Sequence, residues 1–143
     1  MNDPRIELTK ELLTTGQLVD WYRSIGVFVN CSYAEGFGLH LIEAMACGRP
    51  IISTAYSAVT EYFDDKVGYI ADHQIVPASG GPYTGHWAKP VDESVIEQMR
   101  HVYNNRNEAQ AKGQVAALKA RAFTWKDTGL KLINILKDNG VLI

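Results

Sequence analysis

Two glutamates and two glycines lie in the short segment 35–43, and their types and spacing could bind a ligand that carries phosphate. Gly36 and Gly38 allow backbone conformations that other residues avoid, and they let a ligand approach the main chain closely. Glu35 precedes these glycines and Glu43 follows them, so two carboxylates flank the turn. Carboxylates repel phosphate but accept hydrogen bonds from hydroxyl groups, such as those of a sugar diol.

The residues after the glycines predict a helix from Leu39 to Cys47 that ends at Gly48, with Pro50 shortly after it. The first amide groups of a helix lack partners and carry a partial positive charge, which suits an anion. Because helical side chains lean toward the N-terminus, the carboxylate of Glu43 can reach back to the same end. A diphosphate between two hydroxyl-bearing rings, as in a nucleotide sugar, fits this arrangement. For either glutamate alone, complementing the helix dipole is the simpler interpretation.

Short apolar runs around this helix predict a parallel sheet with at least three strands, near 27–31, 50–54 and 67–71. Helices are expected over Gln17–Ile25, before the first strand, and near 59–63, before the third. The alternation of strands and helices implies right-handed crossovers and helices on both faces. We therefore expect an α/β fold with a partial Rossmann-like sheet, whose ligand site lies at the carboxyl edge of the strands.

After the strands, the pattern predicts a long loop over 72–90 and then C-terminal helices over 91–138. A loop of this length in a compact domain is usually functional or mobile. Asp92 is expected to cap the first helix, and its buried face would carry five residues: Val95, Ile96, Met99, Val102 and Tyr103. Thr124 has capping-box spacing with Asp127 and opens a last helix, which should direct three residues inward: Leu130, Ile133 and Leu136.

Composition narrows the class of protein. The 143 residues are 46% hydrophobic and 21% charged, which permits one domain with a buried core. A net charge of −2 argues against a nucleic-acid partner, which would require a basic stripe. The start of the sequence lacks the pattern of a signal peptide, and Cys31 and Cys47 are expected to be buried, reduced thiols. These features favour the cytoplasm, with peripheral membrane attachment of the whole enzyme left open.

Glu35 and Glu43, separated by seven residues and followed by Ala-Met-Ala-Cys-Gly-Arg-Pro-Ile-Ile-Ser, resemble the signature of retaining glycosyltransferases of family 4, or glycosyl transferases group 1. Enzymes of this family have the GT-B fold, in which a cleft separates two Rossmann-like domains. The resemblance falls on the second half of the C-terminal, donor-binding domain. It runs from about Ile6 to Asp138 and is strongest between 21 and 54. Two shorter segments are also similar to the family: Tyr22-Arg23-Ser24 and Phe123-Thr124-Trp125.

The resemblance implies a role for each residue of the motif. Glu35 would be catalytic, contacting hydroxyls of the donor sugar near the reacting carbon, and Glu43 would bind the ribose hydroxyls of the nucleotide. The diphosphate would be held by the backbone of four residues: Gly36, Phe37, Gly38 and Leu39. The implied reaction transfers a sugar from a nucleoside-diphosphate sugar to a sugar, lipid or protein acceptor. It retains the anomeric configuration and usually requires no cofactor and no metal.

Other features depart from the family or lie outside its motif. The Arg and Lys pair that neutralises the diphosphate, and the acceptor-binding domain, lie in the family on elements that this sequence does not contain. Ala55-Tyr56-Ser57-Ala58 stands where family members commonly have a glycine pair. His40 lies beside the motif, but a lone helical histidine is more often a packing or surface residue.

Residues 1–143 are therefore expected to form one incomplete nucleotide-sugar-binding domain with a motif core at 21–71, truncated at its N-terminus and inactive alone. Two alternatives stay open: a non-catalytic nucleotide-binding or degenerate module, and a structural domain with the fold only. In the family, the strand near 27–31 pairs with a strand that is missing here. Its edge should therefore be exposed, or covered by residues 5–13 or by another chain, and we expect self-association or a rearranged N-terminal segment.

Overall fold

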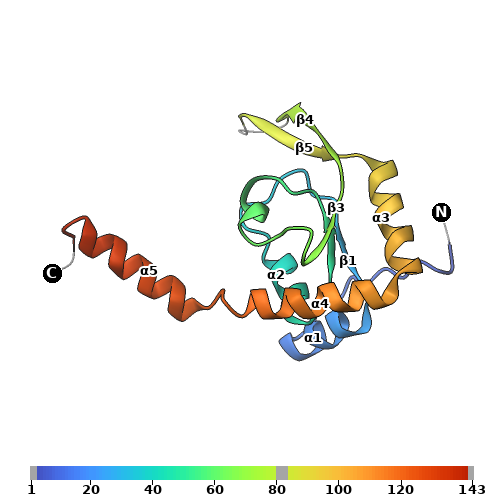
Figure 1. Ribbon diagram of the computed structural model, residues 1–143, viewed down its shortest axis with the longest axis horizontal. Coiled ribbons are helices and arrows are strands. Elements are labelled where there is room, and N and C mark those ends of the chain that lie inside the picture. The colour runs from blue at the N-terminus through green and yellow to red at the C-terminus, as the bar shows by residue number, and fades with distance from the viewer. Residues whose placement is uncertain (1–2, 80–83, 142–143) are drawn as a thin grey trace.

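The computed structural model describes residues 3–79 and 84–141 and has an α/β fold built around a three-stranded parallel sheet (Figure 1). The strand order is β1-β2-β3, and the strands are β1 (Phe28–Asn30), β2 (Ile51–Ser53) and β3 (Gly68–Ile70). The register aligns Val29 with Ile52 and Ile52 with Tyr69. Each strand lies inside its predicted range, because the short apolar runs are closed by glycine, proline or polar residues. The predicted fold class is confirmed.

Helices precede, connect and follow these strands: α1 (Thr15–Ser24), α2 (Leu39–Ala46), the 3₁₀ helix η1 (Ser57–Glu61), α3 (Asp92–Asn104), α4 (Arg106–Ala120) and α5 (Trp125–Asp138). Helix α1 begins two residues before the predicted start at Gln17, because Thr14 and Gln17 form a capping box. The Gln17 amide donates to the Thr14 hydroxyl, and the Thr14 amide donates to the Gln17 side chain. Gly16 therefore lies within the first turn of α1.

Two apolar clusters cover the two faces of the sheet. On one face, Ile51 and Phe28 pack with α2, η1 and the C-terminal part of α4, which contributes Ala116 and Ala120. On the other face, Ile52 packs with α3 and with the N-terminal part of α4. Helix α4 therefore contributes to both clusters, and Figure 1 shows it running across one end of the sheet.

The position of α4 across the end of the sheet depends on Gly113, a glycine in the middle of that helix. A Cβ atom on Gly113 would lie 2.2 Å from the carbonyl oxygen of Gly48 and 3.1 Å from Cδ of Pro50. The turn between α2 and β2 therefore touches the backbone of α4 directly. A side chain at this position would separate α4 from both apolar clusters.

The predicted long loop over 72–90 is wrong, because most of it forms an antiparallel hairpin of β4 (His73–Pro77) and β5 (His86–Pro90). Most side chains of the hairpin are exposed or half-buried, so its strands lack the apolar pattern of a core strand. Residues 80–83 lie outside the described part of the chain. The hairpin is tied to the loops that follow β1 and β2: the Ala88 amide donates to the Tyr33 carbonyl (2.9 Å), and the Tyr56 hydroxyl donates to the His86 carbonyl (3.0 Å). It therefore lies at the carboxyl edge of the sheet (Figure 1).

Helix α3 differs from its prediction in its cap and its buried face. Its N-cap is Val91, and the helix has no side-chain capping hydrogen bond. Asp92, the predicted cap, is instead the first residue of the helix. Asp92 still complements the helix dipole from the first turn. Val95 and Val102 are buried as expected, whereas three residues of the predicted face are exposed: Ile96, Met99 and Tyr103. The helix is rotated so that one edge of the predicted stripe faces the sheet.

Helix α5 begins as predicted, but it does not pack on the rest of the molecule. The Thr124 side chain accepts a hydrogen bond from the Asp127 amide (3.0 Å), which confirms the cap. No residue of α5 is buried, and Figure 1 shows the helix running away from the sheet. The inward orientation expected for Leu130, Ile133 and Leu136 is therefore wrong, because no partner element faces them. None of the helices within residues 3–79 and 84–141 is both long and apolar enough to cross a membrane.

Strand β1 forms one edge of the sheet, and residues 3–13 form no strand beside it. Residues 5–13, one of the expected covers, therefore do not pair with this edge in the described part of the chain. Self-association through the edge stays a prediction. Both cysteines are free, but Cys31 is exposed and Cys47 is half-buried, because each follows an element rather than lying inside one.

Replacement of Gly113 by alanine should lower the free energy of unfolding by about 1–3 kcal/mol, because the new methyl group overlaps the Gly48 carbonyl. Gly129→Ala is the matched control: this glycine is also helical, but a Cβ atom there meets nothing within 4 Å. The control should be neutral or stabilising by up to about 1 kcal/mol, since alanine is the better helix former. Urea unfolding followed by circular dichroism measures both. Equal stability of the two variants would contradict the close approach.

Candidate functional site

The candidate site lies where the loop after β1 turns into α2, at the carboxyl edge of the sheet. Gly38 is the N-cap of α2 and has a left-handed conformation, with φ 82° and ψ 55°. A Cβ atom on Gly38 would lie 2.6 Å from the Tyr62 hydroxyl oxygen and 2.9 Å from Cδ1 of Leu41. Glycine is therefore required here for two separate reasons. Gly36 is different, because its φ is not positive and a Cβ atom there meets nothing within 4 Å. Gly36 therefore does not use the conformational freedom of glycine, but the space beside its backbone is open.

Tyr62, which follows η1, holds the glycine turn from the buried side. Its buried hydroxyl lies 2.5 Å from the carbonyl oxygen of Phe37 and 3.1 Å from that of Gly38, and it donates to this pair of acceptors. The Leu41 amide also donates to the Gly38 carbonyl (3.0 Å). The carbonyls of the turn thus point into the protein, and the first amides of α2, those of Leu39 and His40, are left at the open end of the helix.

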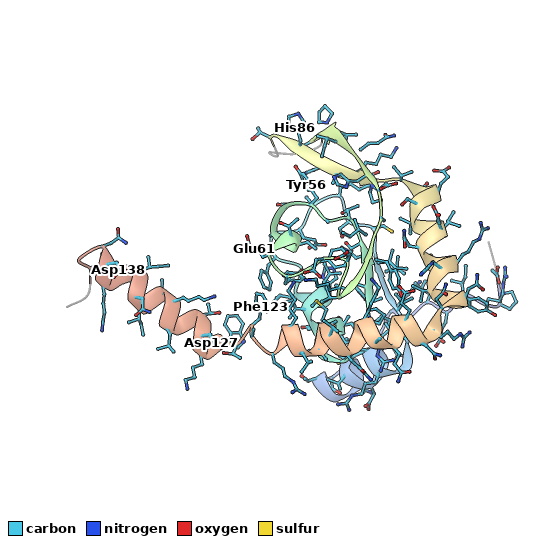
Figure 2. The ribbon with its side chains drawn as sticks, in the orientation of Figure 1. Tyr56, Glu61, His86, Phe123, Asp127 and Asp138 are labelled. Atoms are coloured by element: carbon cyan, nitrogen blue, oxygen red, sulfur yellow. The ribbon has the colours of Figure 1, made fainter. Side chains whose placement is uncertain are left out.

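The environment of Tyr62 keeps its hydroxyl a donor. Burial, and then the charge of nearby Glu35, raise the pKa of Tyr62 well above its usual range. The ring of Tyr62 also contacts the rings of Phe37 and Phe123, with centroid distances of 5.4 and 5.9 Å. Figure 2 shows Phe123 in the segment between α4 and α5, on the same side of the molecule as Glu61. Sequence reasoning gave Tyr62 no role, because it is 24 residues from Gly38 and belongs to no motif.

Glu35 lies beside the start of α2 and is paired with His40. The distance between Glu35 Oε1 and His40 Nε2 is 3.5 Å, and 19% of the Glu35 side chain is exposed. The His40 ring in turn contacts the ring of Phe28 in β1, with centroids 5.8 Å apart. His40 therefore packs against the sheet, as expected, and also lies beside Glu35.

Glu43 lies one turn into α2 and is held by a residue of α1. The Tyr22 hydroxyl donates to Glu43 Oε2 at 3.0 Å. Glu43 is exposed, so its second oxygen is accessible to a ligand. The structure therefore places Glu35 and the glycine turn at the start of α2, and Glu43 on the same helix as the fifth of its eight residues. It adds three supporting residues that the motif did not reveal: Tyr22, His40 and Tyr62.

Arg49, at the end of the motif, donates to the carbonyls of Ile25 (2.9 Å) and Cys47 (3.2 Å), and so closes the turn at the opposite end of α2. Among the described residues, no group of three or more His, Cys, Asp and Glu side chains is arranged to hold a metal ion.

The architecture is that of a GT-B glycosyltransferase domain. Sucrose-phosphate synthase from Thermosynechococcus elongatus has a similar fold, with a TM-score of 0.64 at 22% sequence identity over 82% of this chain and 26% of that chain. A family model described as "Glycosyl transferases group 1" matches residues 2–79, more than half of the sequence. The chain belongs to this family.

Curated relatives carry glycosyltransferase names. A D-inositol 3-phosphate glycosyltransferase from Arthrobacter sp. (strain FB24) is 33% identical over 113 residues, which cover 78% of this chain and 23% of that protein. A protein of the same name from Paenarthrobacter aurescens (strain TC1) is 28% identical over 130 residues, covering 89% of this chain and 28% of that protein. The chain thus spans about a quarter of the length of these relatives.

Replacement of Gly38 by alanine should lower the free energy of unfolding by about 1–3 kcal/mol, because alanine is strained at a positive φ and its methyl group overlaps the Tyr62 hydroxyl. Gly36→Ala, two residues away on an open surface, should change stability by less than about 0.5 kcal/mol. Thermal and urea unfolding of the two variants provide the measurement. A loss at Gly36 as large as that at Gly38 would show that the turn is not held as described.

Proposed function

We propose that this chain is the donor-binding part of a retaining glycosyltransferase of family 4, which transfers a sugar from a nucleoside-diphosphate sugar to an acceptor. The observation that carries the proposal is the glycine turn, whose carbonyls bond to Tyr62 while the first amides of α2 stay at the open end. Glu35 lies beside that end, and Glu43 lies one turn further along α2. Amide groups suit a diphosphate, and carboxylates suit the hydroxyls on either side of it.

Each residue of the site has a distinct part in the proposal. The backbone of the turn, from Gly36 to Leu39, holds the diphosphate. Glu43 accepts hydrogen bonds from the ribose hydroxyls through its free oxygen, since Tyr22 occupies the other one. Glu35, on the opposite side of the helix start, faces the hydroxyls of the donor sugar near the reacting carbon.

The chemistry of transfer explains why the helix start matters. Cleavage of the glycosidic bond separates a positively charged sugar from a diphosphate leaving group, so amides aimed at that diphosphate stabilise the transition state. No metal or other cofactor enters the proposal. The basic Arg and Lys pair of the family has no match among the residues that resemble it, so we propose that these 143 residues bind the donor but do not transfer sugar unaided. The same observation favours the second candidate, a non-catalytic nucleotide-binding module.

Glu43→Gln should weaken the binding of a nucleoside diphosphate by about 5- to 50-fold, because an amide oxygen is a weaker acceptor for hydroxyls than a carboxylate. Calorimetric titration with ADP, GDP and UDP measures the effect and identifies the base. Glu97→Gln removes the same charge from an exposed position on α3 and serves as the control. Unchanged binding by Glu43→Gln would remove the ribose role. Absence of binding by the unaltered chain would overturn donor binding and leave a structural domain.

Glu35→Gln should act on the sugar and not on the nucleotide. We expect the ratio of affinities for a nucleotide sugar and its nucleoside diphosphate to fall by about 5-fold or more, because the sugar hydroxyls lose a charged acceptor. Affinity for the diphosphate alone should stay equal or rise, since a negative charge near the phosphates has been removed. UDP-glucose with UDP and GDP-mannose with GDP are suitable pairs. A parallel loss for both members of a pair would contradict the assignment. Where the whole enzyme transfers sugar, the proton NMR coupling of the product's anomeric position tests retention.

A further inference from the structure

The hydrogen bond between Tyr22 and Glu43 joins two helices that are separated by β1 in the sequence. Tyr22 belongs to α1 and is 4% exposed, whereas Glu43 lies on the exposed side of α2. The Tyr22 hydroxyl lies 3.0 Å from Glu43 Oε2. A buried residue of one helix therefore fixes the exposed carboxylate of another.

Packing leaves the Tyr22 hydroxyl little freedom. Its ring makes T-shaped contacts with the rings of Trp21 and Phe28, with centroids 5.2 and 5.7 Å apart. Phe28 is in β1, so the ring is held against the sheet as well as within α1. Glutamate on an exposed helix face otherwise samples several rotamers, and holding it in one has an entropic cost. Here that cost is met when the chain folds, before any ligand binds.

The protonation state of Tyr22 sets the direction of this hydrogen bond. Burial, followed by the hydrogen bond and charge of Glu43, raises the pKa of Tyr22 well above its usual range. The hydroxyl therefore remains a donor, and one oxygen of Glu43 is always an acceptor for it. This bond occupies Oε2, so Oε1 is the oxygen left for a ligand on this exposed residue.

We propose that Tyr22 is the positioning residue for Glu43: it orients the carboxylate so that Oε1 meets the ribose hydroxyls of the nucleotide. The inference rests on the proposed function, because it needs a ribose at Glu43. It adds that recognition of the diol depends on α1, an element outside the glutamate motif. Tyr22 itself does not touch the ligand.

The test compares ribonucleotides with nucleotides that lack the diol. Tyr22→Phe removes one oxygen atom and keeps the ring, and it should weaken the binding of ADP, GDP or UDP, whichever the chain binds, by about 2- to 10-fold. Binding of the matching 2′,3′-dideoxynucleoside diphosphate should not change, because it has no hydroxyl for Glu43 to accept from. Tyr56→Phe is the matched control, since it also removes a tyrosine hydroxyl that donates at 3.0 Å.

A double variant separates positioning from a general loss of structure. Tyr22→Phe combined with Glu43→Gln should bind the ribonucleotide no more weakly than Glu43→Gln alone, because the two changes remove one shared interaction. Circular dichroism and the Tm of each variant report whether the fold is retained. Additive losses, or equal losses for the ribonucleotide and the dideoxynucleotide, would overturn the positioning role and leave the proposed function standing.

Failure of the proposed function gives a different result. If the unaltered chain binds none of the nucleoside diphosphates, donor binding is wrong and the positioning role falls with it. If it binds ribonucleotides and dideoxynucleotides equally, the diol is not read at Glu43, and the positioning role is overturned while diphosphate binding stands.

Discussion

The bonds from the Tyr62 hydroxyl to the carbonyls of Phe37 and Gly38 are the constraint on which the site depends. The first amides of a helix lack partners within it, and these bonds hold the carbonyls of the turn on the inner side, away from those amides. They also require that residue 38 have no side chain, because a Cβ atom would meet the same hydroxyl. Tyr62 is fully buried and belongs to the main apolar cluster, so the core of the domain directly sets the geometry of the turn.

The two glutamates are supported through a second part of the structure, the aromatic ring of Phe28. The ring of Tyr22 contacts this ring, and its hydroxyl bonds to Glu43. The ring of His40 also contacts it and pairs with Glu35. Strand β1 therefore does more than lead the chain to the site, since its first residue orders the partners of both carboxylates. The residue after η1 bonds to the turn, whereas residues of α1 and β1 support the two carboxylates. The site therefore depends on several elements packed around α2.

The sequence could predict those elements whose residues form short apolar runs closed by glycine or proline. The three core strands and α2 were predicted within a residue or two, because buried runs closed by glycine and proline leave few alternatives. The hairpin of β4 and β5 was missed, since exposed strands carry no apolar alternation. The buried face of α5 was predicted from its amphipathic pattern, but a pattern cannot show that a partner is absent. The roles of Tyr22 and Tyr62 depend on hydrogen bonds to residues that are 21 and 24 positions away in the sequence. The spacing of residues alone cannot reveal such contacts.

The charge of the site indicates what the glutamates contribute. A helix N-terminus stabilises an anion by about 0.3–1 kcal/mol, and by up to ~2 kcal/mol when partly buried. Two like charges about 7 Å apart repel each other by about 2 kcal/mol at an effective dielectric constant near 20, so one carboxylate can cancel the effect of the helix. His40, beside Glu35, offsets one carboxylate when it is protonated. In the proposed function, a bare phosphate would therefore gain little here, whereas a ligand with hydroxyls against both carboxylates would gain hydrogen bonds to charged acceptors. In the proposed function, the glutamates act chiefly through specificity: they penalise simple phosphates and favour a diphosphate flanked by two sugars.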